Sequence, residues 1–69
     1  MLPPPRKTGM SFEFRMKNGA HGVLSIPEDD LHTILSAFRE GQEWITISND
    51  ITTVVINRSE VSYYQYWKN

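Results

Sequence analysis

One amphipathic segment, residues 25–41, constrains the fold most, because it is the only stretch of this 69-residue chain with a helical period. Its apolar side chains recur every three to four residues and form a single stripe, made of Leu31, Ile34, Leu35 and Phe38. Its ends carry a capping-box pair, a first-turn proline and a glycine stop, which are Ser25 with Glu28, Pro27 and Gly41. The acidic residues 28–30 and Arg39 also suit the dipole of such a helix. We therefore predict one helix that packs against strands along its apolar stripe.

The segment before this helix has the pattern of a β-hairpin. Residues 11–17 alternate strictly between polar and apolar, and Asn18-Gly19 is a strong signal for a tight turn. If these two residues alone form the turn, Phe14 lies opposite Val23, and Val23 joins the apolar face of the first strand. A longer loop that reaches Gly22 would shift this register, and the sequence leaves both registers open.

A second hairpin is predicted after the helix. Residues 43–48 and 51–56 are rich in β-branched side chains, and Asn49-Asp50 between them has turn chemistry. With Asn49-Asp50 as a two-residue loop, Ile45 pairs with Val54. This pairing gives the hairpin one consistent apolar face.

The last strand covers residues 61–67, after a polar turn at residues 57–60. The predicted fold class is α+β: a small antiparallel sheet with one helix packed on one face, in the order β-β-α-β-β, with the last segment as a possible short fifth strand. We predict a single domain over residues 10–69 and a disordered Pro-rich tail over residues 1–9, because consecutive prolines cannot donate to a sheet. The tail is either an untidy terminus, with Met10 as an alternative start, or a proline-rich docking peptide.

The composition sets limits on core size, charge and compartment. A chain of 69 residues buries only a modest core, so oligomerisation is an expected source of additional buried area. Seven basic residues stand against eight acidic ones, and two of the basic residues, Arg6 and Lys7, belong to the tail. This balance disfavours binding of polyanions through bulk charge. No apolar run is long enough to span a membrane, and the first residues lack the apolar core of a signal peptide. We therefore expect a cytoplasmic protein without membrane contact, of a size common among accessory proteins of bacteria and phages.

Few residues could carry chemistry, because the chain has no cysteine and only two histidines. Glu28 and His32 are one helical turn apart and could share an ion, but no third ligand has an assignable position. The helix dipole accounts for the first-turn acids. No nucleophile elbow, phosphate loop or cofactor fingerprint is present. We predict a non-enzymatic protein with no catalytic residues, no metal and no cofactor.

The aromatic last strand is the strongest candidate for function. Tyr63 and Trp67 alternate with Tyr64 and Tyr66, and a single helix can cover only one face of the sheet. Exposed aromatic side chains with polar tips are enriched at protein interfaces. We therefore expect a protein-binding or assembly module that self-associates through this strand and contacts a protein partner. The expected partner-binding residues are Trp44, Tyr64, Tyr66 and Trp67. Local packing of these rings within the chain is the alternative.

Single-stranded nucleic acid is a second class of partner. Arg15, Lys17 and Arg58 could contact phosphates while the aromatic side chains stack on bases. The segments FRMKNGAHGVL and VVINRSEVSYY are similar to the opening hairpin and the closing strands of the Sm-like fold, and this resemblance implies RNA binding. The chain departs from that pattern, because an amphipathic helix stands where the family continues directly through bent strands. The base-contacting loop residues of the family also have no match.

Overall fold

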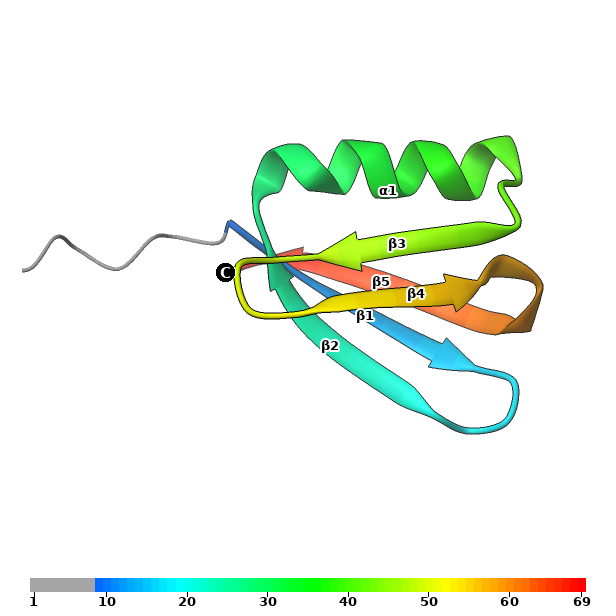
Figure 1. The fold of residues 1–69 in the computed structure, drawn as a ribbon. Coiled ribbons are helices and arrows are strands. Elements are labelled where there is room, and N and C mark those ends of the chain that lie inside the picture. The colour runs from blue at the N-terminus through cyan, green and yellow to red at the C-terminus, as the bar shows by residue number, and fades with distance from the viewer. Residues whose placement is uncertain (1–8) are drawn as a thin grey trace, which may run out of the picture.

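The computed structural model describes residues 9–69, so the Pro-rich tail predicted for residues 1–9 lies, except for Gly9, outside the described residues. The elements in chain order are β1 (Met10–Met16), β2 (His21–Ile26), α1 (Glu28–Glu40), β3 (Trp44–Ser48), β4 (Thr53–Asn57), the 3-10 helix η1 (Arg58–Glu60) and β5 (Val61–Lys68) (Figure 1). The predicted α+β class and element order are confirmed. The fifth strand is present and, with eight residues, is the longest strand of the described chain.

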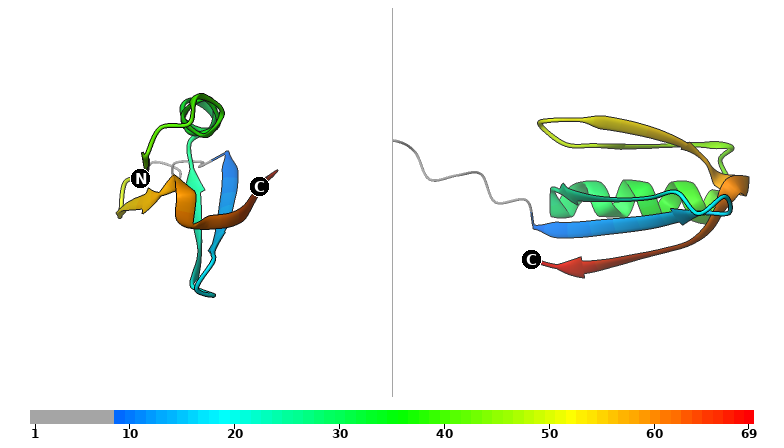
Figure 2. Two further views of the ribbon diagram at one scale, coloured as in Figure 1. Left: turned by 90° about the vertical axis from the view of Figure 1, so that its right-hand side faces the viewer. Right: turned by 90° about the horizontal axis from the view of Figure 1, so that it is seen from below.

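The strands form two small antiparallel sheets. β1 is the central strand of a three-stranded sheet in the order β2-β1-β5, while β3 and β4 form a two-stranded ribbon. α1 runs along one side of the molecule, and the ribbon and β5 lie on opposite sides of the β1–β2 hairpin (Figure 2). The helix and both sheets share one buried core, made of Met10, Phe12, Phe14, Leu24, Ile26, Leu31, Ile34, Ile45, Ile47 and Ile56. The helix therefore covers the strands with its apolar stripe, as predicted, although Leu35 and Phe38 are only partly buried.

The first hairpin has a longer loop than Asn18-Gly19 alone. Phe14 pairs with Gly22 and not with Val23, because Lys17 also belongs to the loop. Among residues 9–69 only glycines have a positive φ, and in this turn Gly19 alone does, at 93°. The mirror-image turn expected for a two-residue loop needs a positive φ at both positions. The two-residue register is therefore wrong, and Val23 faces solvent with 53% of its surface exposed.

The second hairpin is also wider than predicted. Ile45 pairs with Ile56 and not with Val54. The side-chain oxygen of Asn49 accepts two backbone N–H groups from further along the loop, at 2.8 and 2.9 Å, and this stabilises a four-residue connection. The amide nitrogen of Asn49 donates to the carbonyl of Ser25 at 2.8 Å, so the same side chain ties the ribbon to β2.

The sequence predicts the C-terminal end of α1 correctly but not the cap at its N-terminal end. The helix begins at Glu28 with Pro27 as its N-cap, and no side chain caps it. The predicted capping box of Ser25 and Glu28 is wrong, because β2 continues through Ile26 and keeps Ser25 in an extended strand. Gly41 adopts the left-handed conformation, with φ 76°, and ends the helix as predicted. The acidic first turn and the basic last turn are also as predicted.

Candidate functional site along strand β5

β5 is an edge strand and carries most of the exposed aromatic side chains. It pairs with β1 on one side, and within residues 9–69 no strand pairs with its other side. Every residue of β5 after Val61 is exposed. Both views in Figure 2 place the strand at the periphery of the fold. Such an edge presents a row of backbone N–H and C=O groups that a further strand could bind.

Along β5, the backbone N–H and C=O groups of successive residues point alternately to β1 and to solvent. Two hydrogen bonds show which residues point which way. The N–H of Asn69 donates to the carbonyl of Gly9 at 3.1 Å, and on the other side of β1 the N–H of Met16 donates to the carbonyl of Ala20 at 2.7 Å. The odd-numbered residues of β1 therefore bond to β5, and the even-numbered ones bond to β2. By the same alternation, the residues of β5 whose N–H and C=O groups point to the open edge are Tyr64, Tyr66 and Lys68.

A β-bulge limits the regular part of this edge. Arg15 pairs with Tyr63 while Met16 pairs with Val61, so Ser62 is an extra residue without a pairing partner in β1. The hydroxyl of Ser62 donates to the carbonyl of Arg15 at 3.1 Å and stabilises this irregularity. The edge is therefore regular only from Tyr63 onward.

A groove of about 640 Å³ lies between α1 and β5. Side chains from α1, η1 and β5 line it: Leu35, Phe38, Arg39, Arg58, Val61, Ser62, Tyr63, Tyr64 and Tyr66. The rings of Phe38 and Tyr64 stack with their centroids 4.3 Å apart, and Tyr64 also stacks on the fully buried Phe12 at 5.6 Å. These contacts fix Tyr64 in the floor of the groove and still leave 37% of its surface exposed.

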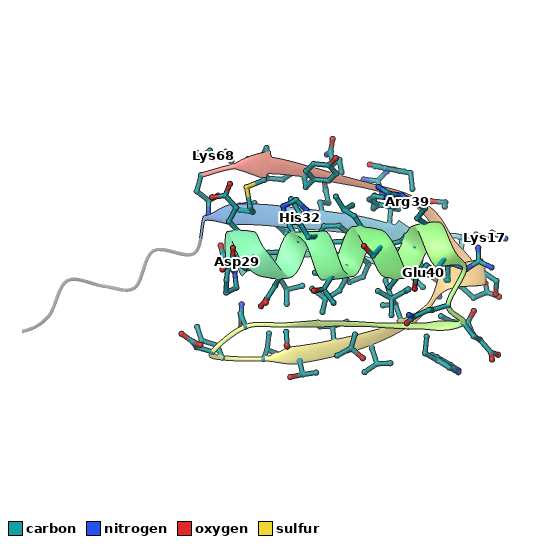
Figure 3. All side chains as sticks on the ribbon, turned by 90° about the horizontal axis from the view of Figure 1, so that it is seen from above. Lys17, Asp29, His32, Arg39, Glu40 and Lys68 are labelled. Atoms are coloured by element: carbon teal, nitrogen blue, oxygen red, sulfur yellow. The ribbon has the colours of Figure 1, made fainter. Side chains whose placement is uncertain are left out.

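Two guanidinium groups make one end of the groove positive. Arg39 lies on the side of α1 that faces β5, as Figure 3 shows. The guanidinium of Arg58 lies 3.9 Å from the position that a Cβ on Gly41 would take, beside the C-terminus of α1, where the helix dipole favours a cation. No acidic side chain is among the described residues that line the groove. The groove therefore combines an aromatic floor with positive charge at one end.

The outer face of the three-stranded sheet carries a second, different set of side chains. The guanidinium of Arg15 lies over the ring of Tyr63, 5.4 Å from its centroid. The amide of Gln65 donates to the carboxylate of Glu13 on the neighbouring strand. Trp67 lies on this face by alternation and is 43% exposed. Gln65 and Glu13 are thus hydrogen-bonded to each other, and the two aromatic rings of this face remain partly exposed.

The predicted partner-binding residues lie on three surfaces. Tyr64 and Tyr66 line the groove, whereas Trp67 lies on the outer face of the same sheet. Trp44 belongs to the β3–β4 ribbon, where it is 57% exposed and pairs with Asn57. β5 therefore carries three of the four predicted residues, on its two faces, and Trp44 lies in the other sheet.

The residues predicted to contact nucleic acid are also dispersed. Arg15 lies on the outer face of the sheet, Arg58 lines the groove, and Lys17 belongs to the loop of the first hairpin. The N–H of Lys17 donates to the carbonyl of Glu60 at 2.8 Å, which ties this loop to η1. Each cation therefore has a different set of neighbours.

The contribution of α1 to the groove is not apparent from the sequence pattern. The apolar stripe accounts for Phe38 and the helix dipole accounts for Arg39, yet both side chains line the groove. An aromatic residue directly followed by a cation at the border of the stripe is the signal that could have indicated this role.

Residues 9–69 contain no group of three side chains that could hold a metal ion. His32 lines a separate hollow together with Thr33 and Ser36. No helix in the described chain is long and apolar enough to cross a membrane.

Comparison with known proteins gives this chain no relatives. It matches no protein-family model. Neither the curated proteins nor the solved structures contain a significant match. The Sm-like similarity of two short segments therefore remains a resemblance, and function has to be argued from the geometry of β5 and the groove.

Proposed function

We propose that this domain is a non-enzymatic protein-binding or assembly module that self-associates through its aromatic C-terminal strand. The observation that carries the proposal is the edge of β5, an eight-residue strand that is open on one side and exposed along nearly its whole length. The groove beside the strand provides pockets for side chains of whatever segment pairs with it.

The sequence of β5 has few of the features that usually protect an edge strand. Natural edges are shielded by proline, by charged side chains, by short length or by a covering element. β5 has no proline and no glycine, and Lys68 is its only charged residue. Its bulge lies near the beginning of the strand and leaves the following stretch regular. An unprotected edge of this kind supports a role in strand pairing with another chain.

The chemistry of the groove supports the same role. In strand addition, main-chain hydrogen bonds supply affinity and pockets for alternate side chains supply specificity. Tyr64 and Tyr66 combine outward-directed backbone groups with side chains that line the groove. A paired strand would therefore place every second side chain against tyrosine rings, which are frequent hot spots of interfaces.

The solution mass as a function of protein concentration tests the proposal. We expect a reversible oligomer that dissociates on dilution. The double substitution Tyr66→Ala/Trp67→Ala removes two hot-spot rings and should weaken association at least about tenfold. Trp44→Ala is the control, because it removes an exposed aromatic ring that lies outside β5. A wild-type chain that stays monomeric up to millimolar concentration would contradict self-association.

Binding of single-stranded nucleic acid is the second candidate, and the stacking of Arg15 on Tyr63 favours it. A guanidinium that is already stacked on a ring next to an open sheet face could contact a phosphate while a base stacks nearby. The test is fluorescence of the two tryptophans during titration with an oligonucleotide at low and moderate salt. Quenching that weakens steeply with salt supports this function. Absence of quenching at low salt counts against it.

A further inference from the structure

The open edge of β5 restricts how a second strand can pair with it. Tyr64, Tyr66 and Lys68 direct their backbone groups outward, so an incoming antiparallel strand has to place its own outward-directed residues opposite these three. If that strand is β5 of a second copy, even-numbered residues face even-numbered residues. A residue, and not the midpoint between two residues, then lies on the two-fold axis.

We infer that two copies of the chain pair antiparallel along β5 about a two-fold axis through Tyr66. This inference rests on the proposed function and specifies its partner and geometry. The bulge at Ser62 confines the regular edge to residues 63–69. Two such stretches overlap completely only when Tyr66 lies opposite its own copy. That arrangement makes three hydrogen-bonded residue pairs, which corresponds to about six backbone hydrogen bonds. An axis through Gln65 or Trp67 makes only about four backbone hydrogen bonds.

The side chains of this stretch are compatible with the same register. On the groove face the two Tyr66 rings lie side by side, and Tyr64 lies opposite Lys68 of the second copy, a pair that permits a cation–π contact. On the outer face Gln65 lies opposite Trp67. Lys68 is the only charged side chain of residues 63–69, and in this register it never faces its own copy. No like charges are therefore directly opposite each other within the paired strands.

The paired dimer would have one continuous six-stranded sheet, in the order β2-β1-β5-β5-β1-β2. Because the axis is perpendicular to this sheet, both α1 helices lie on the same side of it. The two grooves then meet above the paired β5 strands and form one trough, with Tyr64 and Tyr66 of both copies in its floor. Each copy thus contributes residues to a site that is incomplete without the other.

The exposed aromatic area of β5 limits the size of this contact. Four aromatic side chains are each about two-fifths exposed, which corresponds to about 80 Å² per ring and about 640 Å² for two copies. This ring area is smaller than the roughly 1,200–2,000 Å² of stable specific interfaces, so the contact is expected to be weak and to dissociate reversibly. We therefore expect a dimer that forms and separates in the micromolar range.

Cysteine cross-linking tests the register, because the natural chain has no cysteine. In the Tyr66-centred pairing, residues 65 and 67 of opposite copies form a non-hydrogen-bonded pair with Cα atoms about 4.5 Å apart, within disulfide range. The distance from residue 65 or residue 67 to its own copy is a diagonal of about 7–8 Å, beyond that range. Under mild oxidation, Gln65→Cys/Trp67→Cys should therefore give a covalent dimer, and neither single variant should.

A mixture of the two single variants provides a second arm, in which each chain keeps one native side chain of the pair. It should yield only the mixed disulfide between positions 65 and 67. Val23→Cys is the control, because this exposed position lies on the opposite edge strand and should not cross-link. Circular dichroism confirms that each variant is folded.

The outcomes separate the register from the proposed function. Rapid cross-linking of Gln65→Cys alone, or of Trp67→Cys alone, would overturn the Tyr66-centred register and leave self-association through β5 standing. A reversible dimer without any of these disulfides would overturn pairing along β5 between copies. A wild-type chain that is monomeric throughout would overturn both the register and the self-association from which it is derived.

Discussion

Gly22→Ala tests the register of the first hairpin directly. In the structure the ring of Phe14 lies over Gly22, so that a Cβ added at this position would come within 2.8 Å of Cζ and 3.2 Å of Cε1 of that ring. Phe14 is 6% exposed and belongs to the core, which leaves its ring little room to move. An alanine at position 22 therefore overpacks the core.

Two opposing effects determine the size of this change. Replacing a strand glycine by alanine at a compatible backbone position stabilises a protein by about 0.4–1 kcal/mol, because the unfolded chain loses freedom. Overpacking of a well-packed core costs about 1–3 kcal/mol. The clash is the larger effect, and we expect a net loss of about 1–2 kcal/mol in the free energy of unfolding. For a domain of this size that loss lowers Tm by about 4–16 °C.

The assay is urea unfolding followed by circular dichroism at low protein concentration, since self-association would add apparent stability. Phe14→Leu is the matched background, because it removes the ring atoms that the new Cβ would meet. In that background Gly22→Ala should be neutral or stabilising. If Gly22→Ala is as stable as the wild type while Phe14 is present, the ring does not lie over Gly22 and the Phe14–Gly22 pairing is wrong.

Two further predictions concern contacts that connect separate elements. A double-mutant cycle of Phe38→Leu and Tyr64→Leu, measured by urea unfolding, should give a coupling energy of about 0.5–1.5 kcal/mol. The reason is that the two rings stack with their centroids 4.3 Å apart. Additive effects of the two substitutions on the free energy of unfolding would contradict this stack. Asn49→Ala removes three hydrogen bonds, including the tie to β2, and should cost about 1–2 kcal/mol. Asn18→Ala, which removes one exposed turn bond, should cost less in the same measurement, and equal losses would argue against the tie.

The element order could be predicted because each element is marked by its own local pattern. The apolar stripe of α1 and the strict alternation of β1 need no knowledge of neighbours. The hairpin registers could not be predicted in the same way, because they depend on which residues join the loop. In the first loop only Gly19 has a positive φ, and the loop also includes Lys17. Asn49 bonds two N–H groups ahead of it, and this widens the second loop.

The candidate site could also be predicted only in part, because some of its features follow from the local sequence and others depend on tertiary contacts. The alternation of Tyr63 and Trp67 with Tyr64 and Tyr66 is visible in the sequence and holds in the structure. Which of the two faces carries the helix depends on the pairing of β5 with β1, and no local signal specifies it. The bulge at Ser62 has no sequence signature either, since a serine between Val61 and Tyr63 is compatible with an uninterrupted strand.

Tyr64 and Tyr66 line the same groove, but substitutions at the two positions should have different effects. A substitution at Tyr64 affects both stability and association, whereas one at Tyr66 affects mainly association and therefore tests function. Tyr64 stacks on Phe38 and on the buried Phe12, so its removal would destabilise the core and weaken any interface at the same time. Tyr66 is more exposed, at 46% against 37% for Tyr64. A substitution at Tyr66 should therefore leave the free energy of unfolding of the monomer nearly unchanged while it weakens association. Loss of stability at Tyr64 combined with loss of association alone at Tyr66 is the pattern that distinguishes a binding edge from aromatic residues that only complete the core.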